Sequence, residues 1–390
     1  MGIFSKKEKK ELVLLFDIGS SSVGAALFYK QASGVPDIIY TVRRPITLEN
    51  KINIDRFLHL TIEALKIVAN DICMKGFGAP TEIYCVLSSP WHASQTRVLK
   101  LIKDTPIIFT QKLADELIAK ELKLFEEEHK HFYEDGNGKA TTIELKNMKT
   151  ILNGYESANP YGQKAKEIEM SVFVSMVEEH IVDMIVENIN RHFRSAKIKF
   201  ISFVMASSTV ARDMFVNQDS FLLVNIGGEV TDISMIKKDI IKESISFPMG
   251  RNFMVRGLAE DLGVELTEAE TYLSLYKDDH LDTAQEKKIE PAVTKIKTEW
   301  LKNFQDFLST LSNDISIPST VFITVEKDLA KFFSDIIKTE QFNQYILTES
   351  KFRVIFLGSQ ELHGIALLKD HVERDPFLVI ESIYINHFLS

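Results

Sequence analysis

The chain has few cysteines and no long apolar run, and each shortage excludes a class of protein. Only two of its 390 residues are cysteine, Cys73 and Cys85, and they form no C-x-x-C pair. A disulfide-stabilised secreted domain and the usual zinc module are therefore excluded. No stretch reaches the roughly 18 uncharged apolar residues that a membrane-spanning helix requires, and no signal-peptide pattern opens the chain. These absences predict a protein of the reducing cytoplasm.

An excess of positive charge is also lacking. There are 46 Lys and Arg residues against 55 Asp and Glu residues, and the formal net charge is -9. Because no long-range field attracts nucleic acid, no nucleic-acid partner is expected. The hydrophobic fraction of 45% and the charged fraction of 26% are those of an ordinary folded protein. The length allows about two to four compact units.

Two distant segments share one pattern. Residues 12–26 read LVLLFDIGSSSVGAA and residues 221–236 read FLLVNIGGEVTDISMI. Each has an apolar run, an acidic or amide residue, a glycine-containing turn and a second apolar run, which predicts a β-hairpin. A single hairpin of this kind commonly has no ligand-binding role. Two of them in separate halves of the chain predict turns that face each other across a cleft. Glycine and hydroxyl groups can donate to an anion there, so the pair predicts a polyphosphate site.

The rest of the chain predicts mixed α/β layers with an inserted segment. From residue 96 the residue pattern changes. A strand at 97–102 followed by a charged helix at 111–129 predicts an inserted subdomain. The other predicted strands are 38–46, 82–88, 167–177, 240–247, 320–325 and 352–357, and the other predicted helices are 55–69, 182–193, 252–262, 267–276, 288–312 and 328–338.

On these residues the chain resembles the actin, sugar kinase and Hsp70 superfamily, and within it the bacterial actin-like families FtsA, of cell division, and PilM, of type IV pilus assembly. The basic start and the DIGSSSV turn are similar to PilM, and residues 247–276 resemble the stretch after the second phosphate motif in both families. Residues 88–103 and 153–162 look more like FtsA. The tail at 375–390 lacks the linker and basic face of the FtsA membrane helix, and the choice between the two families stays open.

The resemblance implies an α/β, actin-like (ribonuclease H-like) fold with two duplicated lobes and an inserted 1C subdomain of the FtsA/PilM type. The implied divisions are a basic N-terminal tail at 1–10, a first lobe (1A) at 11–95 and 171–215, the inserted subdomain (1C) at 96–170, a second lobe (2A) at 216–250 and 313–390, and a helical subdomain (2B) at 251–312.

It further implies a site for ATP and Mg²⁺ between the lobes. Asp17 would be the metal residue, because magnesium keeps several waters and is reached through one or two carboxylates. Glu270 would meet the ribose, and the alternative is that Glu270 only closes a capping box with Thr267. No catalytic residue is assigned. The implied nucleotide-binding residues are Asp17, Gly19, Ser20, Ser21, Ser22, Asn225, Gly227, Gly228, Glu229, Thr231, Glu270, Thr324 and Glu326.

Three departures from the family pattern weaken this site. Asn225 stands where relatives carry a second acidic residue, and Ser22 and Gly24 stand where a lysine often follows the first turn. The adenosine loop, expected at residues 324–328, contains no glycine, and its rival at 358–359 lies one strand later. Because the departures remove charge and room for a nucleotide, we expect at most a weak ATPase.

The expected function is that of a cytoplasmic assembly platform at the inner face of the cell membrane, with ATP bound weakly or at a degenerate site. Protein partners are expected at the 1C subdomain, with self-association or filaments as a further expectation. The apolar and basic residues 1–10 predict weak membrane contact, at about 1 kcal/mol per basic residue, or else a solvated tail. Two alternatives stay open: a sugar-kinase-like phosphotransferase, for which we identify no catalytic carboxylate, and a nucleotide-independent interaction module.

Overall fold

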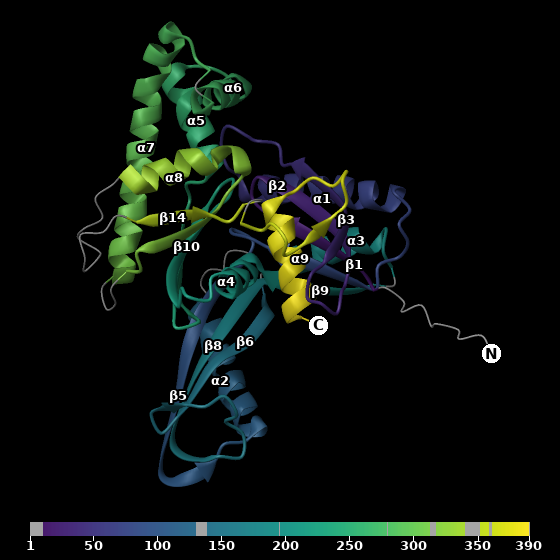
Figure 1. Ribbon diagram of the computed structural model, residues 1–390, viewed down its shortest axis with the longest axis vertical. Coiled ribbons are helices and arrows are strands. Elements are labelled where there is room, and N and C mark those ends of the chain that lie inside the picture. Colours follow the sequence, from purple (N-terminus) through teal and green to yellow (C-terminus); the bar gives the residue numbers. More distant parts are fainter. Residues whose placement is uncertain are drawn as a thin grey trace, which may run out of the picture.

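Three β-sheets and their covering helices make up the computed structural model (Figure 1). The structure describes residues 11–129, 139–194, 196–278, 280–312, 317–339, 352–358 and 361–389. The predicted basic tail at 1–10 and one residue of the rival adenosine loop, Ser359, lie outside these ranges. Within them, no helix is both long enough and apolar enough to cross a membrane.

The first lobe is a six-stranded sheet with the order β15-β3-β2-β1-β4-β9. Strand β1 pairs antiparallel with β2 and parallel with β4, and helices α1 and α3 pack on one face of the sheet. Its elements are β1 (Leu12–Ile18), β2 (Ser22–Tyr29), β3 (Asp37–Pro45), α1 (Ile54–Met74), β4 (Glu82–Leu87), α3 (Glu179–Asn190), β9 (Lys197–Ser202) and β15 (Leu367–Leu368).

The second lobe repeats the strand pairing with which the first lobe begins. In its five-stranded sheet, of order β12-β11-β10-β13-β14, β10 pairs antiparallel with β11 and parallel with β13. Helices α5, α7 and α8 share one core with this sheet. Its elements are β10 (Ser220–Ile226), β11 (Thr231–Lys237), β12 (Ile240–Phe247), α5 (Arg251–Leu262), α6 (Leu266–Lys277), α7 (Thr283–Ser312), β13 (Thr320–Thr324), the 3-10 helix η2 (Lys327–Leu329), α8 (Ala330–Thr339) and β14 (Arg353–Phe356).

An inserted four-stranded sheet, of order β5-β8-β6-β7, projects away from both lobes (Figure 1). Helix α2 covers one face of it through a small core of its own. Strand β5 begins before residue 96 and strand β8 ends after residue 170, the predicted limits of the inserted subdomain. The domain boundaries stay a prediction. The elements are β5 (Ala93–Ile108), α2 (Gln111–His129), β6 (Ala140–Leu152), β7 (Tyr155–Glu156) and β8 (Lys164–Glu178).

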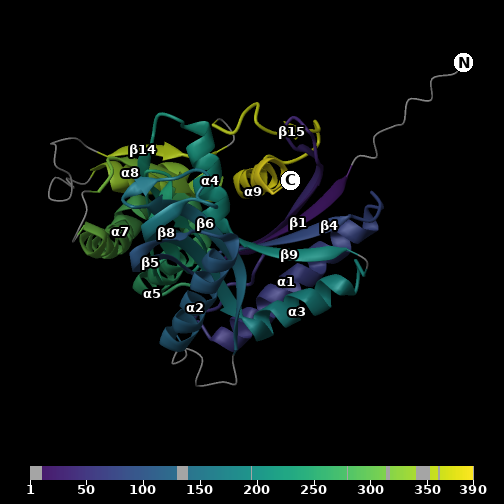
Figure 2. The same ribbon diagram turned by 90° about the horizontal axis from the view of Figure 1, so that it is seen from below.

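Two helices, α4 (Phe203–Met214) and α9 (Pro376–Phe388), lie side by side between the two main sheets (Figure 2). One continuous core joins them to β1 and β10, so it belongs to both lobes. The carboxylate of Asp375 caps α9 by accepting the N–H groups of Phe377 and Leu378, at 3.0 and 3.2 Å. The C-terminal segment is therefore an internal helix that holds the lobes together.

Candidate nucleotide site between the lobes

The two glycine turns lie directly against each other. The first turn, residues 19–21, joins β1 to β2, and the second, residues 227–230, joins β10 to β11. The backbone N–H of Glu229 donates to the hydroxyl oxygen of Ser20 at 3.0 Å. A Cβ atom on Gly228 would lie 2.6 Å from the carbonyl oxygen of Ser20. Only glycine fits there, and at this contact the turns leave no room for a phosphate group.

The first residues of α5 are hydrogen-bonded to the backbone of the second turn. The N–H groups of Arg251 and Asn252 donate to the carbonyls of Gly227 and Gly228, at 2.9 and 2.8 Å. The first N–H groups of a helix are the donors that commonly bind phosphate. Here two of them are used by the protein itself.

Two of the predicted phosphate ligands point into the second lobe. The carboxylate of Glu229 accepts two hydrogen bonds from Arg256, at 2.7 and 2.8 Å, and one from the amide of Asn252 at 2.7 Å. The hydroxyl of Thr231 is fully buried and donates to the carbonyl of Met249 at 2.7 Å. Both side chains have partners within the lobe, and their role in nucleotide binding stays a prediction.

A cavity of about 160 Å³ lies beside the turns. Small-molecule sites usually have about 300 Å³ or more. Residues 373–377, which lead into α9, form one of its walls together with Arg43 and Lys327. Of the predicted site residues, those that line the cavity are Asp17, Gly19, Ser20, Ser21, Ser22, Asn225, Gly227 and Glu326, and those that do not are Gly228, Glu229, Thr231, Glu270 and Thr324.

Arg43, from the neighbouring strand β3, holds the predicted metal residue. Its guanidinium donates to Asp17 at 2.7 Å, to Asp375 at 2.5 Å and to the hydroxyl of Ser22 at 2.9 Å. A Cβ atom on Gly24 would lie 2.9 Å from the guanidinium carbon, so this glycine makes the space that the arginine fills. The cation missing after the first turn is thus supplied by β3, already paired with the carboxylate that a metal would need.

Glu381 of α9 adds a third carboxyl group to this cluster. It is fully buried, and among the described residues no donor pairs with its oxygens. Burial and the nearby charge of Asp17 raise the pKa of Glu381 well above its ordinary value. Burial also raises the pKa of Asp17, against the opposing effect of Arg43. Glu381 therefore holds its proton to higher pH than an exposed glutamate does, since the single guanidinium of Arg43 is shared with Asp17 and Asp375.

The predicted ribose and adenosine residues are tied to each other. Arg251 lies between Glu270, at 3.3 Å, and Glu326, at 3.5 Å, and thus links α6 to the loop after β13. The alternative role of Glu270, closing a capping box with Thr267, is wrong, because α6 starts one residue earlier and its N-cap is Glu265.

A second polar cavity, of about 180 Å³, lies behind Asn225 and shares Ser88 and Asn225 with the first. Its wall holds His92 and Asp232, whose carboxylate accepts a hydrogen bond from Ser246 at 2.5 Å. Burial lowers the pKa of His92, and the charge of Asp232 opposes that effect. The sequence did not identify this pair, because His92 lies just before β5 and Asp232 lies on β11, in a different sheet.

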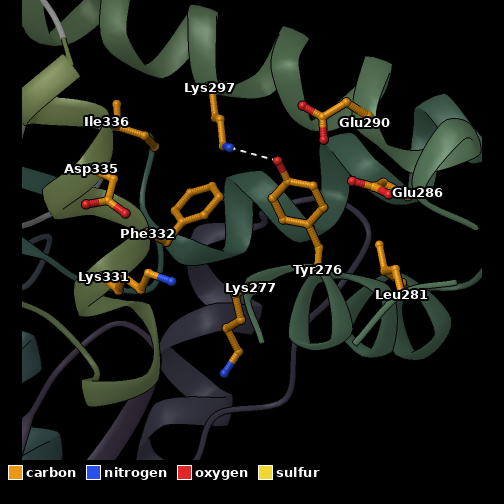
Figure 3. A pocket seen from close by; sticks show the side chains of 10 residues that line it. All are labelled: Tyr276, Lys277, Leu281, Glu286, Glu290, Lys297, Lys331, Phe332, Asp335 and Ile336. Carbon is orange, nitrogen blue, oxygen red and sulfur yellow. Dashed lines mark hydrogen bonds between the residues drawn. The ribbon is translucent and has the colours of Figure 1, made fainter. Parts of the chain in front are cut away.

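A third hollow, of about 370 Å³, lies between α6, α7 and α8 and contains none of the predicted residues (Figure 3). Lys297 sits between the rings of Tyr276 and Phe332, at 4.8 and 4.9 Å from their centroids, and donates to the Tyr276 hydroxyl at 3.0 Å (Figure 3). Three lysines and three carboxylates line it, so its charge favours no one ligand class.

The comparisons with known proteins settle the fold. No protein-family model and no curated protein matches the chain. A solved structure of the "PilM-PilN type IV pilus biogenesis complex" is 10% identical, with a TM-score of 0.62 over 96% of this chain and 98% of that one. A second solved structure, ethanolamine utilization protein EutJ from Carboxydothermus hydrogenoformans, is 11% identical (TM-score 0.42, 97% and 89% covered). A third, a Bacteroides thetaiotaomicron protein with an actin-like ATPase fold, is 10% identical (TM-score 0.35, 91% and 94% covered).

The chain has an actin-like ATPase fold. The predicted two-lobe α/β class is confirmed by the sheet topology and by the PilM structure as a neighbour in fold. At such low identity the likeness extends to the fold alone.

The described residues do not fit Mg-ATP in this arrangement. Asp17 is paired with Arg43, the cavity is small, and no group of three His, Cys, Asp or Glu side chains among the described residues is placed to hold a metal ion.

Proposed function

We propose that this chain is an actin-like assembly platform of the FtsA/PilM type that recruits protein partners at the inner membrane and has a degenerate nucleotide site. The observation that carries the proposal is the ion pair between Arg43 and Asp17, in a cavity walled by residues 373–377. A nucleotide with magnesium has to displace the partly buried guanidinium of Arg43, which is hydrogen-bonded to Asp17, Asp375 and Ser22. Binding is therefore weak, and the position of the lobes is set by the protein's own contacts.

The PilM-PilN structure supports the expectation that this chain binds a protein partner. That solved structure is a PilM-PilN type IV pilus biogenesis complex, in which a protein of this fold is found together with another protein. In this chain the inserted sheet and α2 project from the lobes and provide surface for such a partner (Figure 1). Self-association into filaments and membrane contact through residues 1–10 stay predictions.

Isothermal titration calorimetry with Mg-ATP tests the nucleotide site. We expect a dissociation constant weaker than about 1 mM for the wild type, which corresponds to about -4.1 kcal/mol, and no phosphate release. Arg43→Ser, checked for folding by circular dichroism, is expected to bind at least about tenfold more tightly, because it frees Asp17. Micromolar binding with brisk hydrolysis by the wild type would contradict the proposal.

Affinity capture tests the platform. We expect the full chain to retain a defined protein partner, and a chain with residues 96–170 replaced by a short linker to lose it while keeping the helix content of the two lobes. Equal capture by both chains would place the partner elsewhere.

A phosphotransferase is the second candidate, and the cavity with Asp232 and His92 favours it. A carboxylate beside a histidine, next to the phosphate turns, is the kind of base that transfer to a hydroxyl requires. Transfer of labelled phosphate from ATP to a sugar, abolished by Asp232→Asn, would select this candidate over the platform.

A further inference from the structure

A groove separates the inserted sheet from the lower end of the second lobe, apart from the nucleotide cavity. Its volume is about 530 Å³. On one side it is formed by the face of the inserted sheet that α2 does not cover, since successive side chains of a strand alternate between faces and Met170 and Val172 of β8 pack in the core under α2. The residues that line it are Lys149, Ile151, Glu169, Ser171, Ser220, Lys237, Lys238, Ile240, Lys242, Ile317 and Pro318.

The charge of this groove is opposite to that of the chain. Four lysines and one carboxylate line it, although the chain as a whole has a net charge of -9. The carboxylate, Glu169, is already paired with Lys100 outside the groove, at 3.0 Å. Lys149 is paired with Glu156. The three other lysines come from one hairpin, β11–β12.

The backbone of that hairpin is adapted to present them. Met235 pairs with Glu243 and Ile236 with Ile241, so Lys242 is an extra residue that has no partner across β11. Such a bulge re-aims a side chain. At the hairpin tip, Lys238 has a φ of +47°, in the left-handed region that glycine and asparagine prefer. Asp239, the other central residue of this two-residue turn, also has a positive φ, so the turn itself places the Lys238 side chain at the tip.

Lysines in this hairpin repel one another. Burial lowers the pKa of Lys237, and the positive charge of Lys242 lowers it further. An anion bound near Lys242 would offset this effect of its charge.

The bottom of the groove is apolar. Ile240, Ile317 and Pro318 line it and are themselves buried. A concave site with an aliphatic floor does not match a flat bilayer, and it gives no aromatic surface for stacking nucleic-acid bases. It matches an extended chain that carries both carboxylates and aliphatic side chains.

We propose that this groove binds an acidic peptide segment of a protein partner, with its carboxylates at Lys238 and Lys242 and an aliphatic side chain against the partly exposed Ile151. The inference rests on the proposed platform function and gives the partner a chemistry.

Fluorescence anisotropy with the full chain tests it. The probe is a short fluorescein-labelled peptide of Glu, Leu and Ser, and its control has Gln in place of Glu. We expect saturable binding of the acidic peptide that weakens as salt is added. The double variant Lys238→Glu/Lys242→Glu should weaken it at least about tenfold, because each site then repels the probe. The matched control, Lys112→Glu/Lys120→Glu on the exposed face of α2, makes the same charge change and should leave binding unchanged.

Three results would overturn the inference: no binding of the acidic peptide by the wild type, equal loss in both double variants, or equal binding of the Gln peptide. Co-sedimentation with phosphatidylglycerol vesicles that depends on Lys238 and Lys242, without peptide binding, would identify the groove as a lipid contact instead. Capture of a partner that persists in the Lys238→Glu/Lys242→Glu variant would refute the groove and leave the platform function standing. Loss of capture on removal of residues 96–170 tests the platform separately.

Discussion

One arginine determines what the nucleotide site can do. Arg43 is a covalently tethered cation, and its pairs with Asp17 and Asp375 are largely shielded from water. A charge that is shielded from water is destabilising without a partner of opposite charge, so each member of the cluster keeps the others in position. The candidate site is thereby held together by the protein's own charges, which is consistent with the proposed platform function.

Replacing Arg43 with methionine, which has similar length and no charge, should therefore be severe. We expect Arg43→Met to lower the free energy of unfolding by about 3 kcal/mol or more, because the buried carboxylate of Asp17 and the partly buried one of Asp375 lose their partner. The control is its neighbour Arg44, whose pair with Asp71 is half exposed, and Arg44→Met should cost about 1 kcal/mol or less. Urea denaturation measures both. Similar losses for the two variants would show that the cluster is ordinary surface charge.

Glu381 makes stability depend on pH. Because burial raises its pKa well above the ordinary 4.5, the folded chain keeps a proton that the unfolded chain releases as the pH rises. The unfolded state then binds fewer protons, so this group lowers stability with increasing pH, by at most about 1.4 kcal/mol per pH unit. The loss begins near the unfolded pKa and ends at the folded one.

Glu381→Gln cannot ionise and should lack this contribution. We expect the wild type to lose more stability than the variant as the pH rises above the ordinary glutamate pKa of 4.5, as measured by urea denaturation at several pH values. Glu187→Gln, at an exposed position of α3, should keep the wild-type slope. Parallel slopes for the wild type and Glu381→Gln would mean that Glu381 ionises normally.

Among the elements, the hairpins and most helices were predictable from the sequence. The helix predicted at 111–129 and the strand predicted at 240–247 have the observed bounds of α2 and β12, because period and composition agree locally. Helix α9 was missed because its apolar residues surround it and leave no amphipathic period. Asp375-Pro376, an N-cap followed by proline at the first helical position, was the signal that could have revealed it.

The contents of the site were less predictable than its turns. Asp17, Gly19 and Gly227 were found because a glycine turn has a local signature. Arg43 was not, since it reaches Asp17 only through the register that places it opposite Gly24 on β2. Residues 373–377 wall the cavity only because α9 folds back between the lobes, and such long-range packing leaves no local pattern.

For the whole molecule, the core around α4 and α9 is the feature that joins the lobes. Leu223 and Phe221 of the second lobe share it with Val13 and Leu15 of the first, so neither lobe is a separately packed body. The two should therefore unfold together. Independent lobes would instead each have a closed core and its own transition.

The two tryptophans allow this to be measured, because Trp91 packs in the core of the first lobe and Trp300 in that of the second. In Trp91→Phe and in Trp300→Phe, we expect the urea midpoint from the remaining tryptophan's fluorescence to coincide with the midpoint from far-ultraviolet circular dichroism. Adding Leu378→Ala in α9 should cost about 2–5 kcal/mol and shift both midpoints together, because this buried side chain packs in the shared core. A shift at one tryptophan alone would show that α9 belongs to one lobe and that the lobes are free to move apart.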